Sequence, residues 1–331
     1  MIDLLPDADQ QALVTSVTEF LSNEVPVTRL RPAPGSALPP PQQDRWADYA
    51  AMGWFGIGLD ERLGGIGLGI AEAVLVSREF GRYLASPALL GAQLAAHTLA
   101  ASDPALCSAI LGGKCRVGLA HAGTETTNYL IDAEQADLLL RLDRNSISLF
   151  RPSAFDARAK VPALDGALSL ERAQLTGTAL AFSADPALAR SARIMISAML
   201  VGAAEASLKL AVDYAAQREQ FGQVIAGFQA IKHLCADLAV RAEAAWAQVL
   251  LAALSEHGAL MGAGFEAAAA ELLARSAAVE VTEQCIQIHG GMGFVVETDA
   301  HHFLKRVHLL VKLLGNIRDS QQYMLAEALP A

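Results

Sequence analysis

Apolar residues recur at steps of three and four along most of this chain, the period that places side chains on one face of an α-helix. One such face is formed by Phe228, Ile231, Cys235, Leu238, Ala242 and Trp246. After Pro186 the period predicts five helices, over 187–216, 224–256, 263–288, 298–313 and 316–328. Before Cys115 it predicts helices over 7–24, 42–52, 70–84, 86–101 and 104–111. The pattern therefore predicts a largely helical chain.

The helical period disappears between about Cys115 and Phe182. Short apolar runs replace it there: VGLAH, YLID, LLLRL, SISLF and ALSLERAQL. Glycine, aspartate, asparagine and proline separate the runs, as expected for short strands joined by turns. We therefore predict a mainly α fold with a β insert: an N-terminal helical domain (1–114), a small middle β domain (115–185) and a C-terminal domain resembling a four-helix bundle (186–331).

Proline and glycine clusters mark the loops. The segment PAPGSALPPP, residues 32–41, contains five prolines and is predicted to be a loop. In DERLGGIGLG, the glycines Gly65, Gly67 and Gly69 are spaced somewhat as in a dinucleotide-binding motif. That motif follows a strand, whereas helices are predicted on both sides here. We therefore interpret it as a glycine turn before the helix that begins at Ile70.

Size and charge restrict the class of protein. With 331 residues, of which 53% are hydrophobic, the chain can bury a large core in one or two domains. It carries 35 acidic and 25 basic side chains, a formal net charge of -10, and the basic residues are scattered. Nucleic-acid binding needs clustered positive charge, so we expect no nucleic-acid partner.

Cysteine usage and the N-terminus point to the cytoplasm. Cys107, Cys115, Cys235 and Cys285 lie far apart without a CxxC spacing, so we expect reduced, mostly buried thiols. The first residues, MIDLLPDADQQ, are acidic and unlike a secretory signal. No uninterrupted apolar run reaches the roughly 18–20 residues of a membrane span. We expect a cytoplasmic protein without a membrane partner.

Two stretches carry candidate binding chemistry. In QREQFGQVIAGFQAIKHLCADL, Arg218 and Gln220 stand just before a helix break at Gly222. The planar guanidinium of an arginine pairs two phosphate oxygens at once. In CIQIHGGMGF, the glycines predict a turn between two helices, where bare backbone amides beside Gln287 suit a phosphate or an adenine edge.

Together these stretches resemble the C-terminal domain of the acyl-CoA dehydrogenase family. The segment ERLGGIGLG, followed by a helix that ends in REFGR, resembles the N-terminal helical domain of that family. The order of helical, β and helical domains also matches. The resemblance covers nearly the whole chain, and it is strongest in the C-terminal helices and weakest in the β insert.

The resemblance implies FAD as the cofactor and an oligomer that binds it at subunit interfaces. In the family, an arginine and a phenylalanine of an RxxFG motif, with a glutamine and glycines of a QxxGGxG motif, reach the FAD of a neighbouring subunit. The matching positions are Arg218, Phe221, Gln287, Gly290 and Gly291. For Phe221 and the glycines, a simple role in a helix turn is the alternative.

The family reaction needs a glutamate that removes the α-proton of an acyl-CoA, while the β-hydride passes to the flavin. The position of that glutamate falls on Leu314, within KLLGNIR. A minority of the family carries it on the helix before RxxFG, where this chain has Ala192. Neither side chain can take a proton, so no catalytic residue is assigned. Asn316 and Arg318 also replace the usual threonine and glutamine.

The β insert departs from the family pattern as well. Its stretch VGLAHAGTETT lacks the usual tyrosine and Thr-Glu-Pro, and no tryptophan occurs between Trp54 and Trp246. The chain is similar in this respect to short, catalytically depleted subunits of hetero-oligomeric acyl-CoA dehydrogenases, such as those acting on steroid side-chain CoA thioesters. The first hypothesis is therefore a subunit without its own base that acts on an acyl-CoA with a catalytic partner.

The sequence does not determine the acyl group or whether the chain forms a homo- or a hetero-oligomer. Two alternative functions also remain open. One is a self-sufficient enzyme whose base is relocated to Glu297 or Asp319; the other is a non-enzymatic member that binds acyl-CoA or protein. A histidine-rich stretch follows, with His301, His302, Lys305 and His308. No carboxylate completes a spacing such as HExxH, so we expect a polar helix face rather than a metal site.

Overall fold

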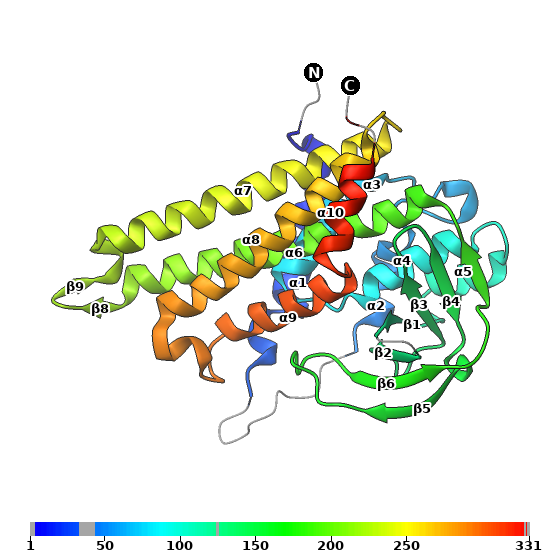
Figure 1. Ribbon diagram of the computed structural model, residues 1–331, viewed down its shortest axis with the longest axis horizontal. Coiled ribbons are helices and arrows are strands. Elements are labelled where there is room, and N and C mark those ends of the chain that lie inside the picture. Colours follow the sequence, from blue (N-terminus) through cyan, green and yellow to red (C-terminus); the bar gives the residue numbers. More distant parts are fainter. Residues whose placement is uncertain (1–3, 33–43, 124–125, 328, 330–331) are drawn as a thin grey trace. The chain divides into compact units, whose positions relative to one another are not determined.

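The computed structural model describes residues 4–32, 44–123, 126–327 and 329. The proline-rich loop predicted over 32–41 lies, apart from Pro32, outside these residues. The chain forms two compact units, each assembled from segments that are separate in the sequence (Figure 1). The first unit consists of Met1–Pro41, Val74–Ala85 and Ile194–Ala331, and the second of Gln42–Ala73 and Ser86–Arg193.

Long helices make up the first unit. They are α1 (Ala8–Glu24), most of α3 (Ile70–Arg82) and of α6 (Pro186–Gln217), α7 (Gln229–His257), α8 (Ala263–His289), α9 (Ala300–Leu313) and α10 (Ile317–Ala326). Helices α7 and α8 run side by side in opposite directions (Figure 1). Gly262 begins α8 with φ +89°, a left-handed conformation that glycine adopts without a side-chain clash. This reversal lets α8 return along α7.

Helices α3 and α6 cross at very short range within the first unit. A Cβ atom on Gly202 would lie 1.9 Å from the carbonyl oxygen of Arg78, and one on Gly81 would lie 2.0 Å from that of Met199. Glycine at both positions is therefore what allows the two backbones to touch. Arg78 and Arg82 of α3 both pair with the Glu205 carboxylate of α6, which fixes the crossing.

Two helices of this unit, α6 and α7, are long and apolar enough to cross a membrane by length and composition alone. The apolar stretch of α6 is 72% buried inside the protein, and that of α7 is 50% buried. A core helix of a helical assembly is expected to have this composition. Packing within the unit therefore accounts for the apolar character of α6.

A seven-stranded sheet dominates the second unit, with helices α2 (Trp46–Ala51), α4 (Ala88–Leu99) and α5 (Pro104–Leu111). The strands are β1 (Val117–Ala122), β2 (Thr127–Ile131), β3 (Leu138–Leu142), β4 (Ile147–Phe150), β5 (Phe155–Lys160), β6 (Leu170–Leu175) and β7 (Ala181–Ser183). Their order across the sheet is β5-β6-β2-β1-β3-β4-β7. Strands β1 and β3 pair in parallel and the other neighbours are antiparallel. Apolar side chains of the inner strands, among them Leu130, Leu139 and Phe150, form the core of the sheet.

The predicted fold class, mainly α with a β insert, is confirmed, and the helix over 104–111 has the predicted bounds. Strands β5 and β7 were not among the predicted runs. All residues of β5 after Phe155 are exposed, so it has no apolar alternation to announce it, and β7 has only three residues. The domain boundaries after residues 114 and 185 stay a prediction.

The remaining short segments are 3-10 helices, which tighten the connections between the longer elements. They are η1 (Val27–Leu30), η2 (Trp54–Gly56), η3 (Glu61–Leu63), η4 (Pro152–Ala154), η5 (Ile225–Gly227) and η6 (Gly290–Phe294). The glycine-rich segment before α3 is a turn, as predicted: Gly64 and Gly67 have φ +89° and +70°. A Cβ on Gly65 would lie 1.9 Å from the Leu59 carbonyl oxygen, so these glycines serve local packing.

Candidate functional site

The first candidate stretch forms a β-hairpin after α6. Strands β8 (Glu219–Gln220) and β9 (Gln223–Val224) pair antiparallel, and the amide of Ile225 donates to the carbonyl of Arg218 over 2.8 Å. The helix predicted to begin at 224 begins only at Gln229, after the hairpin and η5. That prediction was wrong because two successive residues with positive φ, Phe221 and Gly222, reverse the chain.

Phe221 occupies the tip of this hairpin in a costly conformation. Its φ is +54°, the left-handed region that costs a residue with a side chain about 1–2 kcal/mol. Its side chain is nevertheless 92% exposed and meets the ring of Phe228 edge-on, at 6.2 Å between centroids. Neither turn geometry nor burial explains a phenylalanine here. The hairpin therefore leaves an aromatic side chain exposed that its own fold does not require.

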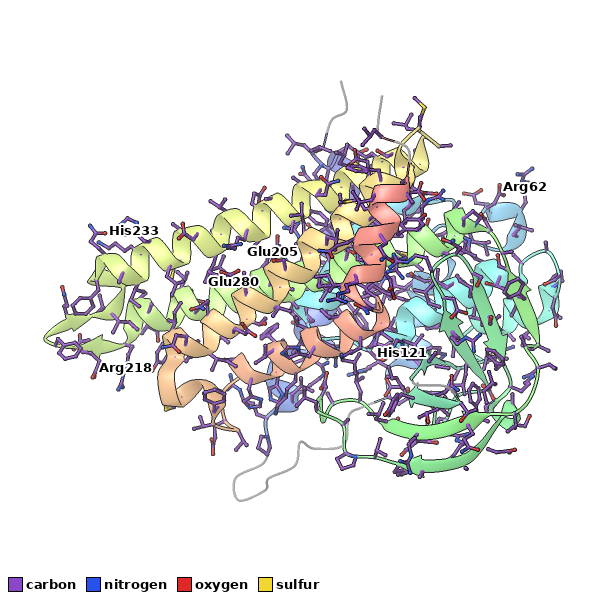
Figure 2. The ribbon with its side chains drawn as sticks, viewed as in Figure 1. Arg62, His121, Glu205, Arg218, His233 and Glu280 are labelled. Carbon is purple, nitrogen blue, oxygen red and sulfur yellow. The ribbon has the colours of Figure 1, made fainter. Side chains whose placement is uncertain are left out.

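Arg218 stands at the base of the hairpin, where α6 ends. Its amide donates to the carbonyl of Tyr214 over 2.9 Å, which completes the last turn of the helix. The side chain is exposed, and within the described part of the chain no carboxylate or carbonyl pairs with its guanidinium. Figure 2 shows Arg218 at the end of the helices that carries β8 and β9. The guanidinium is thus free to bind an anion.

The second candidate stretch ends α8 and forms η6. Gln287 is exposed, and Gly290 turns the chain with φ +59° and ψ -137°. Gly291 has no positive φ, and a Cβ there would meet nothing within 4 Å. By contrast, a Cβ on Gly293 would lie 2.9 Å from the Ile286 carbonyl oxygen. Internal packing therefore explains Gly293 but leaves the bare backbone at Gly291 open to an outside group.

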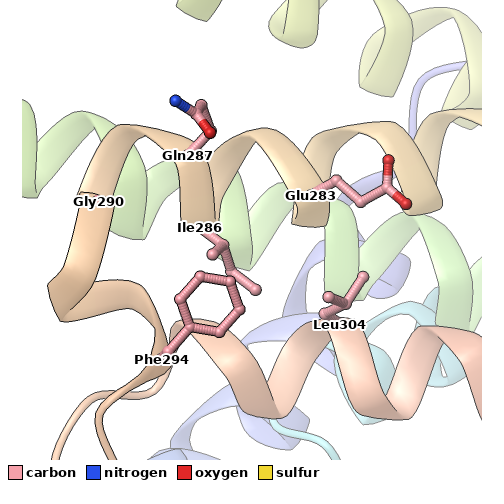
Figure 3. A pocket seen from close by; sticks show the side chains of 6 residues that line it. All are labelled: Glu283, Ile286, Gln287, Gly290, Phe294 and Leu304. Atoms are coloured by element: carbon pink, nitrogen blue, oxygen red, sulfur yellow. The ribbon is translucent and has the colours of Figure 1, made fainter.

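A cavity of about 290 Å³ lies beside this turn, between α8 and α9. It is lined by Glu283, Ile286, Gln287, Gly290, Phe294 and Leu304 (Figure 3). Phe294 is 71% exposed, and Figure 3 shows its ring beside Ile286. The end of α8 therefore offers an aromatic ring, an amide side chain and bare backbone in one place.

The structure brings the two candidate stretches to the same end of the helical unit. The ring of Tyr214, one turn before Arg218, stacks on the ring of His289 with centroids 4.2 Å apart and planes at 23°. His289 lies between Gln287 and Gly290 in the sequence. Sequence reasoning missed this stack, because the two residues belong to helices that are distant in the chain.

The two expected positions of a catalytic glutamate are both buried and apolar. Leu314 closes α9 and is 1% exposed, and Ala192 in α6 is fully buried. The turn after Leu314 is held by Arg275, whose guanidinium donates to the carbonyl of Gly315 over 3.0 Å. Arg275 also pairs with the buried Glu271 at 3.3 Å. The turn is therefore closed by structural contacts.

Glu271 is a buried carboxylate that sequence reasoning missed. It is fully buried in α8 and accepts hydrogen bonds from Arg275 and from Ser320 of α10. A Glu–Arg pair four residues apart on an alanine-rich helix was the available signal. The hydrogen bond from Ser320 joins α10 to α8, and the bond from Arg275 lies within α8, so this carboxylate has a structural role.

The relocated bases considered above are exposed. Glu297 lies before α9 and Asp319 lies in the first turn of α10, and both side chains are open to water. Proton abstraction from carbon needs a carboxylate held out of water near its target. Because the carboxylates of Glu297 and Asp319 are both exposed to water in this chain, neither is well placed to act as the base.

The prediction of a polar helix face around His301 was wrong. His301 and His302 are 6% and 9% exposed, and their rings lie 4.1 Å apart. Burial, followed by the nearby charge of Lys305, lowers the pKa of His301 below its usual value. The first turn of α9 is enclosed on all sides, because the consecutive residues Ala300, His301, His302 and Phe303 are all buried. Among the residues that the structure describes, no cluster of three or more ligands could hold a metal ion.

The stretch VGLAHAGTETT forms β1 and the turn towards β2, of which residues 124–125 lie outside the described residues. His121 of β1 faces Tyr129 of β2 in the register (labelled His121 in Figure 2). Gly118 is enclosed, because a Cβ there would lie 2.8 Å from the Asp132 carbonyl oxygen. The stretch therefore forms a strand of the predicted β insert, although it lacks the tyrosine and the Thr-Glu-Pro named above.

Comparison with known proteins identifies the family. Residues 7–125 match the N-terminal domain of acyl-CoA dehydrogenases, and residues 187–317 match their C-terminal domain. Acyl-CoA dehydrogenase IpdE2 of Mycobacterium tuberculosis is 35% identical over 263 residues, which cover 79% of each chain. Acyl-CoA dehydrogenase FadE34 of the same organism is 34% identical over 296 residues, 82% of this chain but 41% of FadE34.

Solved structures show the same fold. A chain of the ChsE4–ChsE5 complex of Mycobacterium tuberculosis matches this chain with a TM-score of 0.81 and 22% sequence identity, and the match covers 100% of both chains. Butyryl-CoA dehydrogenase of Megasphaera elsdenii gives a TM-score of 0.80 at 18% identity, with 98% of both chains covered. Family matches at both ends and a relative that spans most of the chain establish the assignment. This chain belongs to the acyl-CoA dehydrogenase family.

Proposed function

We propose that this chain is a subunit of a hetero-oligomeric acyl-CoA dehydrogenase that lacks its own catalytic base and completes the FAD site of a catalytic partner. The observation that carries the proposal is a contrast within the chain. Arg218, Phe221 and Gln287 are exposed at one end of the helices, whereas Leu314 and Ala192 bury apolar side chains at the positions of the base.

The exposed residues fit part of a flavin dinucleotide. Family membership supports FAD as the cofactor, and it accepts a hydride from the substrate when bound. Arg218 has an unpaired guanidinium for the pyrophosphate, and the open backbone at Gly291 lets another chain's ligand approach its amide. Phe221 offers a stacking surface, and Gln287 offers both a donor and an acceptor.

The α-proton of the acyl-CoA needs a carboxylate from elsewhere. Leu314 and Ala192 have no titratable group, and Glu297 and Asp319 are solvated. Glu271 is already engaged by Arg275 and Ser320. In the proposed complex the partner subunit therefore holds the base, and this chain binds and orients the cofactor.

The comparisons support a partner of the same family. The relative solved as ChsE4–ChsE5 is a complex of two different chains, and another, Tcur3481–Tcur3483, is described as a steroid acyl-CoA dehydrogenase. By analogy we propose an α,β-dehydrogenation of a steroid-type CoA thioester. A cytoplasmic location is part of the proposal, supported by four cysteines, all described and all free.

The visible spectrum tests this proposal. We purify the chain alone, its genomic neighbour of the same family alone, and the two after co-expression. The expected result is a stable complex with bound flavin that oxidises acyl-CoA, and no acyl-CoA oxidation by this chain alone. If the chain alone carries flavin and oxidises acyl-CoA at a rate equal to that of the mixture, it is a self-sufficient enzyme and the proposal is wrong.

A further inference from the structure

A stacked pair of rings connects the ends of α6 and α8. Tyr214 and His289 lie with ring centroids 4.2 Å apart and an interplanar angle of 23°. His289 is 6% exposed, and Tyr214 is half-buried. Such aromatic pairs add about 0.5–1.5 kcal/mol beyond the area they bury. The pair is thus one direct contact between these two helix ends.

The orientation of the His289 ring is fixed by a hydrogen bond. Its Nδ1 atom lies 2.7 Å from the carbonyl oxygen of Cys285, one turn earlier in α8. A carbonyl oxygen only accepts, so Nδ1 carries the proton and donates it. The ring therefore cannot turn without losing both the hydrogen bond and the stack on Tyr214.

Each of the two stacked residues is connected through the backbone to a residue of the proposed FAD site. The amide of Arg218 donates to the carbonyl of Tyr214 over 2.9 Å, so the stacked residue also holds the backbone from which the guanidinium extends. On the other side, the amide of Gly290 donates to the carbonyl of Gln287 directly around His289. Moving either ring would move one half of the site relative to the other.

We propose that Tyr214 and His289 are positioning residues that set the separation between Arg218 and the Gln287–Gly291 turn. This inference rests on the proposed function, since it concerns the FAD site that the chain offers to its partner. A ligand bound at two separate stretches gains affinity when they are held in place beforehand. The pair supplies that rigidity without itself contacting the cofactor.

FAD titration of the complex with its catalytic partner tests the inference. We expect His289→Leu and Tyr214→Leu to weaken FAD binding about tenfold, whereas Tyr214→Phe, which keeps the stacked ring, stays within about twofold of wild type. If His289→Leu does not fold, His289→Asn replaces it, because asparagine retains a donor for the Cys285 carbonyl but removes the ring. Melting temperatures of each complex without flavin are measured in parallel.

A double-mutant cycle separates positioning from a general effect on stability. In an Arg218→Ala background, His289→Leu should weaken FAD binding by clearly less than tenfold, because the arginine that it positions is gone. An equal factor in both backgrounds, or no loss of FAD affinity in either ring variant, overturns the inference. If wild-type complex binds FAD no better than the partner alone, the proposed function has failed instead, and the two failures are distinguishable.

Discussion

The hairpin tip and the α9–α10 turn treat their key side chains in opposite ways. At the tip, Phe221 is 92% exposed and has φ +54°. Neither its burial nor its backbone conformation stabilises the fold. At the turn, Leu314 is 1% exposed and follows an ordinary helical conformation, while Arg275 secures the next carbonyl. One region carries strain and exposure, and the other is relaxed and closed.

This difference indicates where the chain's function lies. Backbone strain and exposed apolar groups persist where an activity or a partner requires them. A turn closed by Leu314 has no such cost and offers no proton acceptor. The proposed division of labour follows, with this chain supplying cofactor contacts at the tip and the partner supplying the chemistry.

The largest expected effect lies in the core that supports both regions. Gly202→Ala would place its Cβ 1.9 Å from the Arg78 carbonyl oxygen, so α3 and α6 must separate. We expect a loss of about 3 kcal/mol or more in the free energy of unfolding, or insoluble protein. Urea titration of the chain measures it.

Gly291→Ala, in η6 after α8, is the matched control. A Cβ there meets nothing within 4 Å, so the unfolding free energy should stay within about 0.5 kcal/mol of wild type. In the complex the same variant should weaken FAD binding. Equal stability loss in both glycine variants would remove the distinction between the packed α3–α6 crossing and the open turn after α8.

Restoring a carboxylate at the closed turn should destabilise the chain. Leu314→Glu places an ionisable group at a 1% exposed position, and we expect a cost of about 3 kcal/mol at pH 7. Burial would raise the folded pKa of the new carboxyl above its unfolded value, so the unfolded state releases its proton first. The loss should therefore grow as pH rises above about 4.3 and shrink towards that pH.

Leu314→Met is the control, with an expected cost below about 1.5 kcal/mol and no such pH dependence. Thermal unfolding at pH 4.5 and 7 measures both variants. We also expect no acyl-CoA oxidation by the Leu314→Glu chain alone, because its stretch VGLAHAGTETT lacks the tyrosine and the Thr-Glu-Pro that the family resemblance leads one to expect. Robust turnover by that chain would show that only the base is missing.

Replacing the strained phenylalanine at the hairpin tip should raise the stability of the chain and lower the FAD affinity of the complex. Phe221→Asn puts the Asn-Gly pair favoured by this kind of turn in the place of a strained phenylalanine. We expect the isolated chain to gain about 0.5–1 kcal/mol in unfolding free energy. The complex should lose about tenfold in FAD affinity.

Chemical denaturation and flavin titration of the same preparation test the trade. A variant that gains stability and keeps full FAD affinity would mean that Phe221 has no role in the site. Phe228→Leu, which alters the ring beside it without relieving the turn, separates the two effects.

The smallest expected effect is a decline in the stability of the chain as the pH falls from 7 to 5. Burial lowers the pKa of His301 and of His97, so both are neutral in the folded chain over a wider pH range than in the unfolded chain. As pH falls below about 6.5, the unfolded state binds protons that the folded state does not, and stability declines. The melting temperature between pH 7 and 5 measures this.

His301→Leu should reduce that decline, since it removes one of the two groups. An unchanged pH dependence would place the responsible groups elsewhere.

The sequence predicted the helices well because their apolar period is carried by many residues. It failed at the hairpin, since two paired residues on each side of Phe221 and Gly222 are too few to show a strand pattern. It placed His301 on a polar face because residue type, not position on α9, decided that prediction.

The candidate site was predicted only as far as its motifs reach. The two stretches single out Arg218 and Gln287 as candidates, and Leu314 at the expected position of the base leads to the prediction that this chain has none. The stack of Tyr214 on His289 depends on how α6 and α8 end side by side, which no local pattern encodes. Likewise, only the structure distinguishes Gly293, which packing requires, from Gly291, which it does not.

The affinity of the co-expressed complex for FAD, with wild-type chain or with Arg218→Ala, tests the central claim most directly. Arg218 pairs with no described group and is exposed, so its removal should leave the melting temperature of the flavin-free complex unchanged. We predict a loss of FAD affinity of about tenfold or more, corresponding to about 1.4 kcal/mol or more, from one charge-assisted contact. Unchanged FAD affinity in the Arg218→Ala complex would contradict the claim that this chain completes the partner's cofactor site.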